Sequence, residues 1–211
     1  MISRAHSVIF VHIPKCGGQT LEMLFLNDLR INWSQRELLC LKYNEDKQRG
    51  PERLAHLFAK EYKDFEYVSE HEFNSFFKFA VVRNPFSRIV SELNFRKISR
   101  RGNCAKDYIK HASKLDIMSD IRRHVIPQVD YVRSDHGSNI LVDQIYKLEE
   151  FEHWFENFAL KSRLDCRKTI IKNRSRFSEW SVKSLSLEDR EFIFEFYRDD
   201  FEEFGYKNIC I

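Results

Sequence analysis

The sequence predicts a single-domain α/β fold in which helices flank a mainly parallel central sheet. Residues 7–12 and 77–82 are short apolar runs that each end in a tight turn and are followed by apolar residues at helical spacing. Residues 141–147 are a third candidate strand before another helical pattern. Strands that alternate with helices are typical of a parallel sheet, and ligands bind such sheets beyond the carboxyl ends of the strands.

Composition excludes some classes of function. The 211 residues contain no internal repeat and no Pro/Gly-rich linker, which fits one domain over residues 1–211. A net charge of +3 is too small to indicate a nucleic-acid partner. Basic side chains nevertheless gather in the middle of the chain, between Arg96 and Arg123, where they would suit an anionic ligand.

Apolar runs and cysteines predict the location of the protein. The apolar run near the start is too short for a signal peptide, and no window approaches the ~18 apolar residues of a membrane span. The five cysteines are scattered and form no CxxC pair, so neither a zinc site nor a disulfide framework is indicated. We therefore expect a soluble, cytoplasmic protein with reduced thiols and no membrane span.

The first predicted strand, residues 7–12, leads through a glycine-containing loop into a helix over residues 20–29. Lys15, two adjacent glycines and Thr20 occupy this loop. Glycines let backbone N–H groups approach an anion, and a helix N-terminus adds partial positive charge. The loop therefore predicts either a phosphate-binding cradle or a tight turn with an exposed lysine. It is not a Walker P-loop, because the lysine precedes the glycines.

The second predicted strand, residues 77–82, is followed by an Asn-Pro turn and a helix over residues 87–95. Arg83 stands at the end of the strand, while Arg88 and Ser91 are three positions apart and share one face of the helix. An arginine fork and a hydroxyl that converge there would match a phosphate monoester. Because both loops follow strands of a parallel sheet, we expect them at the same edge.

The rest of the chain continues the alternating pattern. A third strand is expected over residues 141–147, with an amphipathic helix that begins near Glu149. The last long helix is expected over residues 187–199. The phenylalanines from Phe192 to Phe201 are expected to pack in the core.

At its two loops the sequence resembles the sulfotransferases that use PAPS (3′-phosphoadenosine 5′-phosphosulfate). IFVHIPKCGGQT, residues 9–20, is similar to the 5′-phosphosulfate loop of the carbohydrate branch, which includes heparan sulfate 2-O-sulfotransferases and the HNK-1 and chondroitin enzymes. RNPFSRIVS, residues 83–91, is similar to that branch's 3′-phosphate motif, RNPxxRxxS. Weaker similarities are HxxPQ at residues 124–128 and YxxDFxxFGY at residues 197–206. The similarities run in order along almost the whole chain and imply a P-loop-like sulfotransferase fold.

The resemblance also implies the ligands and the residues that bind them. PAPS would be the co-substrate, no metal would be required, and the acceptor would be a glycan or another hydroxyl-bearing small molecule. Arg83 and Ser91 would hold the 3′-phosphate, and Arg174 lies in a basic segment that resembles a loop covering the nucleotide. Cys16 and Gln19 replace the threonine or serine common at their positions, and Cys16 is the poorer hydrogen-bond donor. The residues implied for the 5′-phosphosulfate end are Pro14, Lys15, Cys16, Gly17, Gly18, Gln19 and Thr20.

Sulfuryl transfer, like phosphoryl transfer, needs positive charge at the leaving oxygen and a base for the acceptor hydroxyl. Lys15 is expected to stabilise the leaving oxygen. His71 is the first choice of base, because in the heparan sulfate 2-O-sulfotransferases a catalytic histidine precedes the 3′-phosphate strand in a similar segment. Glu70 or Glu72 could orient His71 or act as the base instead, and His124 is the second choice of histidine.

Two other functions fit parts of the pattern. A P-loop kinase or other NTPase would share the α/β layout, although the position of the lysine argues against it. A nucleotide-binding protein without catalysis would keep the two loops and lack the base. Outside the loops, His12 is expected to be a hydrogen-bonded core residue, and Arg100–Arg101 either faces solvent or contacts a glycan.

Overall fold

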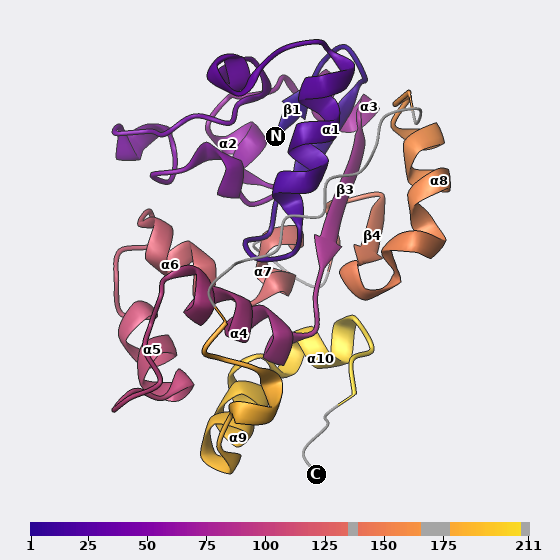
Figure 1. The fold of residues 1–211 in the computed structure, drawn as a ribbon. Coiled ribbons are helices and arrows are strands. Elements are labelled where there is room, and N and C mark those ends of the chain that lie inside the picture. The colour runs from indigo at the N-terminus through magenta and orange to yellow at the C-terminus, as the bar shows by residue number, and fades with distance from the viewer. Residues whose placement is uncertain (135–138, 166–177, 208–211) are drawn as a thin grey trace.

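Among the described residues, four strands form one sheet at the centre of the molecule (Figure 1). The strands, in their order across the sheet, are β1 (Ile2–Ser3), β2 (Val8–Val11), β3 (Phe77–Val82) and β4 (Gln144–Lys147). β1 pairs antiparallel with β2, whereas β2, β3 and β4 run parallel, with Val8 opposite Phe77 and Phe79 opposite Gln144. The predicted α/β fold class is confirmed, and the edge strand β1 is an addition to it. The computed structural model describes residues 1–134, 139–165 and 178–207.

Helices flank this sheet in two groups. Near the sheet lie α1 (Gly18–Asp28), α2 (Glu61–Asp64), α3 (Glu70–Ser75) and α8 (Phe151–Lys161). At and beyond the carboxyl end of β3 (Figure 1) lie α4 (Pro85–Phe95), α5 (Ala105–Ala112), α6 (Asp120–Val125), α7 (Gln128–Val132), α9 (Leu187–Phe196) and α10 (Arg198–Glu203). The 3₁₀ helices are η1 (Trp33–Leu39), η2 (Lys47–Arg49), η3 (Leu54–His56), η4 (Leu148–Glu150) and η5 (Val182–Ser184). No helix in these ranges is long and apolar enough to cross a membrane.

The start of α4 is fixed by its own sequence. The Asn84 side chain accepts hydrogen bonds from the amides of Phe86 and Ser87, and Pro85 occupies the first helical position, where its missing N–H costs nothing. This cap turns the chain sharply at the end of β3. Arg83 is therefore held at the strand end, at the edge where β2 and β4 also finish.

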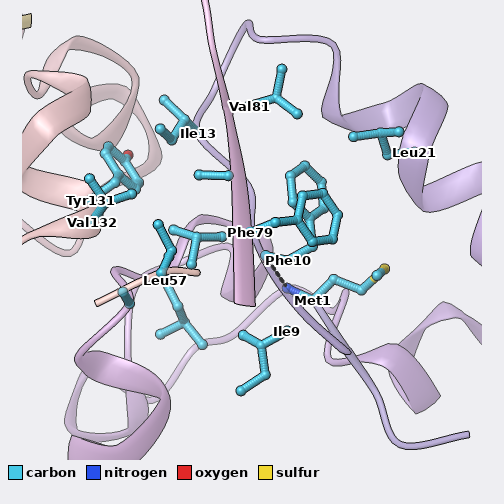
Figure 2. Packing of buried hydrophobic residues seen from close by; sticks show 14 of the residues in the cluster. Met1, Ile9, Phe10, Ile13, Leu21, Leu57, Phe79, Val81, Tyr131 and Val132 are labelled. Atoms are coloured by element: carbon cyan, nitrogen blue, oxygen red, sulfur yellow. Dashed lines mark hydrogen bonds between the residues drawn. The ribbon is translucent and has the colours of Figure 1, made fainter. Parts of the chain in front are cut away.

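Two apolar clusters hold these elements together. Around the sheet, Phe10 of β2 and Phe79 of β3 are buried and stack with their ring centroids 4.7 Å apart (Figure 2). Burial of a side chain of this size contributes roughly 1.5–3 kcal/mol. A second cluster joins α4, α5, α9 and α10 and includes Phe86, Ile109 and Phe201. The loops that follow the strands are therefore supported by packed cores.

The predicted last helix, residues 187–199, is two helices. Tyr197 leaves the helical region, with φ −110° and ψ 26°. Its hydroxyl donates a hydrogen bond to the Val125 carbonyl at 2.8 Å, and this buried contact holds the chain at the break. The break turns α10 so that the Asp200 carboxylate accepts a hydrogen bond from the Gln128 amide at the start of α7.

Candidate functional site

A pocket of about 630 Å³ opens where β2, β3 and β4 end, at the edge predicted for ligand binding. Its volume lies within the range of small-molecule and cofactor sites, about 300–1,000 Å³. The predicted donor-binding residues that line it are Pro14, Lys15, Gly17, Gly18, Gln19, Thr20, Arg83 and Ser91. The pocket is also lined by His12, Arg53, His56, Phe95, His124, Leu148, Glu149, Phe151, Glu152 and His153.

The first loop presents its backbone to the pocket. Gly17 has φ 83°, and among the described residues no side chain caps the helix α1 that follows it. Gly18 has no room for a side chain, because a Cβ there would lie 2.1 Å from the His12 ring. Lys15 also has a positive φ, 67°, which Arg83 stabilises by donating from Nη1 to the Lys15 carbonyl at 3.2 Å. The loop can therefore offer amide groups and the positive end of α1 to an anion.

The amine of Lys15 is placed beside an aromatic ring. Its Nζ lies 3.7 Å from the centre of the Phe95 ring. Burial lowers the pKa of Lys15 to about 8, and the nearby Glu92 carboxylate opposes this decrease. An anionic ligand in the pocket would favour the protonated form further. Lys15 is therefore a poorly hydrated cation, whose attraction to an anion is stronger than it would be in water.

The side chain of Gln128 lies between the two loops and forms hydrogen bonds to both. Its buried side chain donates to the Arg83 carbonyl at 2.8 Å and accepts from the Arg83 amide at 2.8 Å. The Asp200 carboxylate in turn accepts from the Gln128 side chain at 3.1 Å. Gln128 belongs to the HxxPQ pattern and Asp200 to the closing YxxDF pattern. These two patterns therefore support the second loop through hydrogen bonds to its backbone.

The side chain of Cys16 is turned away from the pocket, so the prediction that this residue helps to bind the donor is left to its backbone. Its Sγ is buried and donates to Gln128 Oε1 at 3.2 Å. Burial raises the pKa of the Cys16 thiol to about 12, so the group stays neutral. Only the backbone of this residue can contribute to an anion-binding cradle.

Arg88 has a structural task that its position in the RNPxxRxxS motif does not reveal. It is 1% exposed, although it was expected to face a phosphate together with Ser91. Its guanidinium donates to three buried carbonyls, those of Pro14 at 3.1 Å, Ile126 at 2.8 Å and His124 at 3.1 Å. Arg88 therefore fastens the first loop to the segment after α6, and of the two arginines in the motif it is Arg83 that lines the pocket.

His56 and His124 line another side of the pocket, and the buried carboxylates of Glu92 and Asp120 lie next to them. These four residues are here called the histidine wall. His56 donates from Nδ1 to the His12 carbonyl at 3.1 Å, because a carbonyl can only accept. His124 donates from Nδ1 to Glu92 Oε2 at 2.6 Å. The Nε2 atoms of both rings face Asp120 Oδ1, at 3.9 Å from His56 and 3.4 Å from His124.

The pKa values of the groups in the histidine wall are shifted, so that some of these groups are charged and His56 is neutral. Burial lowers the pKa of His56 well below its ordinary value, and the charges of the neighbouring histidines add to this effect. Burial would raise the pKa of Glu92, but His124 and Arg96 outweigh it and hold the value at about 2. The pKa of Asp120 is likewise lowered, against the effect of burial, by His124 and other cations. The wall therefore combines ionised carboxylates with a neutral His56.

His71 does not lie in the pocket, which corrects the first choice of base. It is exposed on α3, which lies at the start of β3 (Figure 1). The pocket is lined by Arg83, which follows the other end of this strand. The strand has six residues, which span roughly 20 Å. The adjacent Glu72 caps α3 together with Ser69 and pairs with Arg4 at 2.6 Å, and Glu70 is exposed on the same helix. None of these groups can reach Lys15.

The other predicted residues fall in different places. His124, the second choice of base, lines the pocket. His12 is buried and its Nδ1 lies 2.5 Å from Glu22, as expected of a core histidine, and its ring also borders the pocket. Arg100–Arg101 is exposed on the loop after α4. Arg174 lies outside the described residues.

Sequence reasoning missed three members of the histidine wall: His56, Glu92 and Asp120. One signal was present, because Asp120 and His124 are four positions apart on α6 and so share one face. Glu92 directly follows Ser91 on a helix that was predicted. His56 has no comparable signal, since it ends a 3₁₀ turn in a segment without periodic apolar residues.

The sequence matches a known protein family over nearly its whole length. A model of the sulfotransferase family matches residues 1–207. The chain belongs to the sulfotransferase family. Its general activity is therefore the transfer of a sulfuryl group, and its mainly parallel sheet with flanking helices agrees with the sulfotransferase fold. Neither the curated proteins nor the solved structures contain a match to it.

Proposed function

We propose that this sulfotransferase moves the sulfuryl group of PAPS to a hydroxyl group of a carbohydrate, with Lys15 at the leaving phosphate and His56 as the base. The observation that carries the proposal is that Lys15, Arg83 and a neutral His56 border one pocket. PAPS carries anionic groups at two ends of an adenosine, and the two loops offer cations at two points of that pocket. Sulfotransferases generally use this donor.

In the proposed donor site the first loop binds the 5′-phosphosulfate and the second loop binds the 3′-phosphate. Lys15 and the amides at the start of α1 would contact the 5′ end. Arg83 uses one N–H for the Lys15 carbonyl and would direct others to the 3′-phosphate, beside the Ser91 hydroxyl. A Walker-type ATP site would instead need the lysine after the glycines and an acid for Mg²⁺, so a kinase is the weaker alternative.

The adenine ring of the donor would pack on the apolar side of the pocket. Leu148 packs so closely over the first loop that a Cβ on Gly17 would lie 2.7 Å from its Cδ1. Phe151, at the start of α8, lines the same side and offers an aromatic ring. Stacking of a base on an aromatic side chain contributes about 1–3 kcal/mol. This side would therefore add affinity that does not depend on charge.

His56 is the proposed base because its protonation state suits the task. Its Nδ1 proton is held by the His12 carbonyl, so the neutral ring presents an unprotonated Nε2. In His124 both nitrogens already have carboxylates nearby, Glu92 at Nδ1 and Asp120 at Nε2. We therefore assign His124 a positioning role next to His56, whose ring centroid lies 5.1 Å from its own.

The proposed reaction is a single in-line transfer. The acceptor oxygen forms a bond to sulfur as the bond between sulfur and the 5′-phosphate oxygen breaks, and His56 Nε2 takes the hydroxyl proton. Negative charge develops on the departing phosphate oxygen, where the Lys15 ammonium stabilises it. The products are 3′,5′-adenosine bisphosphate (PAP) and a sulfate ester.

Two observations support a carbohydrate acceptor. One is the resemblance to the carbohydrate branch, and the other is an exposed aromatic ring beside the histidine wall. Phe95 is 43% exposed and lines the pocket between Lys15 and His124, which both contact its ring. A flat apolar ring beside polar groups suits a sugar, which has apolar C–H faces and hydroxyl edges.

Ligand-dependent melting temperatures and a transfer assay test the proposal together. PAP should raise the melting temperature strongly, while ATP with Mg²⁺ should change it little. Labelled PAPS should then transfer its sulfuryl group to members of a panel of oligosaccharides, and less to phenols or simple alcohols. Equal stabilisation by both nucleotides would favour a kinase. Stabilisation by PAP without transfer to any acceptor would favour a nucleotide-binding protein that lacks catalysis.

A further inference from the structure

Three metal-binding atoms lie close together in the histidine wall. His56, Asp120 and His124 each contribute one, and these atoms all lie within 4.8 Å of one another. Asp120 Oδ1 is 3.4 Å from His124 Nε2 and 3.9 Å from His56 Nε2. In a tetrahedral zinc site, whose bonds measure about 2.0–2.2 Å, neighbouring ligand atoms are roughly 3.4 Å apart. Small shifts of these side chains would therefore complete such a site.

Both imidazole rings are held as metal ligands usually are. The Nδ1–H of His56 is donated to the His12 carbonyl, and that of His124 to the Glu92 carboxylate. A carbonyl or carboxylate on the second nitrogen fixes the ring and leaves Nε2 for a metal. A metal binds imidazole only in its neutral form, and in that form of both rings two lone pairs and the Asp120 carboxylate face one another. These three acceptors repel each other unless a cation lies between them.

The Asp120 carboxylate uses one oxygen for a hydrogen bond and leaves the other, Oδ1, without one among the described residues. Arg96 donates to the other oxygen, Oδ2, at 2.8 Å, which turns Oδ1 toward the histidines. Within the described parts of the chain no group donates a hydrogen bond to this buried oxygen. The Nε atom of Arg53 lies 3.3 Å away, on a side chain that is 53% exposed. Arg53 is thus a nearby charge that would compete with a metal at Oδ1, and its exposed side chain can move into solvent.

We propose that the chain binds Zn²⁺ through His56 Nε2, His124 Nε2 and Asp120 Oδ1. Two imidazoles and one carboxylate are ligands that suit zinc, whereas Mg²⁺ prefers a set of oxygens. Three protein ligands leave a fourth position for water or a ligand atom. Both histidines line the pocket, so the ion can enter from it.

Zinc at this position blocks sulfuryl transfer. The ion occupies His56 Nε2, the atom that takes the acceptor proton, and this consequence alone rests on the proposed function. The site is therefore inhibitory, and sulfuryl transfer proceeds when the metal is removed.

Cobalt(II) provides a direct probe of the zinc site, because its visible absorption intensifies in a tetrahedral site. Added to the chelator-treated protein, Co²⁺ should produce this absorption at a single equivalent, Zn²⁺ should abolish it, and excess Mg²⁺ should leave it unchanged. His124→Ala and Asp120→Asn should each weaken zinc binding by at least about 10–100-fold, the loss typical even of an outer-shell partner. His153→Ala, in the same pocket but outside the cluster, should bind Co²⁺ as the wild type does.

A further variant should bind zinc more tightly than the wild type, and this test does not depend on whether the variants at the metal ligands are stable. Arg53→Gln removes the competing charge at Asp120 Oδ1 and should tighten zinc binding several-fold. The proposal is overturned if wild-type protein takes up no stoichiometric Co²⁺, or if folded His124→Ala binds zinc as tightly as wild type. Activity is measured separately: bound zinc with undiminished transfer would leave the metal site standing and remove His56 as the base.

Discussion

The two loops and the histidine wall border the same pocket but are built in different ways. The loops are local: each is a short stretch between one strand and one helix, and the first presents mainly backbone, held by Gly17 at φ 83° and Lys15 at φ 67°. The wall is assembled from η3, α4 and α6, and its groups are buried side chains. A site made of backbone leaves a sequence motif, whereas a site made of distant side chains depends on tertiary packing.

The largest expected effect on activity distinguishes His56 of the histidine wall from His71, the base first chosen from the sequence. His56→Ala should lower kcat by about 10²–10⁴-fold, the usual contribution of a general base, with little change in the affinity for PAP. His71→Ala should retain wild-type activity, because His71 lies at the other end of β3. A labelled-PAPS assay measures both variants. Full activity in His56→Ala, or a loss confined to His71→Ala, would contradict the assignment.

Arg88 joins the first loop to the segment that carries the wall, and its removal should affect stability. Arg88→Met leaves the carbonyls of Pro14, Ile126 and His124 without their donor. Each buried polar group left unsatisfied costs about 1–3 kcal/mol, so the free energy of unfolding should fall by about 3 kcal/mol or more. Urea denaturation measures this change. Arg83→Ala, which removes a less buried arginine from the same motif, is the matched control and should cost much less. Equal losses in the two variants would mean that Arg88 is no more structural than Arg83.

The pH dependence of the reaction tests the charge on the first loop. Burial lowers the pKa of Lys15 to about 8, so the ammonium prevails below this pH and is lost as the pH rises through it. The value of kcat/KM for PAPS, which reports the free enzyme, should therefore fall about tenfold per pH unit above that point. Lys15→Arg keeps its charge and should lose this alkaline limb, whatever its absolute rate. An unchanged alkaline limb in Lys15→Arg would assign the titration to another group.

The smallest predicted effect concerns the apolar side of the pocket. Phe151→Ala should raise the KM for PAPS about tenfold, because the adenine loses a stacking partner, and should leave kcat nearly unchanged. Leu160→Ala, at the exposed end of the same helix, is the control. Steady-state kinetics distinguish the two. If kcat falls and KM stays the same, Phe151 does not stack on the adenine and acts instead on the acceptor or on the transfer step.

The sequence predicted the fold and the loops because both depend on short-range patterns. The apolar runs before Arg83 and before the first loop, each followed by helical spacing, were sufficient to place the two loops at one edge of a parallel sheet. The same reasoning failed where side-chain direction matters. Cys16 and Arg88 lie within the two motifs, yet both side chains are buried and form hydrogen bonds to neighbouring segments instead of facing the pocket.

The proposed base could not be predicted from the sequence, because its properties come from burial and from partners distant in sequence. His56 is neutral and oriented through the His12 carbonyl, 44 positions away, and through desolvation that exists only in the folded chain. His71 has a conspicuous setting between two glutamates, but Glu72 serves to cap α3. A titratable residue in a suggestive local sequence is therefore weaker evidence than one placed in a pocket.

The central claim is that the two loops bind opposite ends of one donor, and affinity for the 3′-phosphate tests it most directly. Calorimetry would compare PAP with AMP, which lacks that phosphate, in wild-type protein and in Arg83→Ala. Wild type should prefer PAP, and Arg83→Ala should lose about 10–100-fold of affinity for PAP, as expected for a charge-assisted hydrogen bond, while its affinity for AMP stays the same. An equal loss for both ligands, or no preference for PAP in the wild type, would contradict the account.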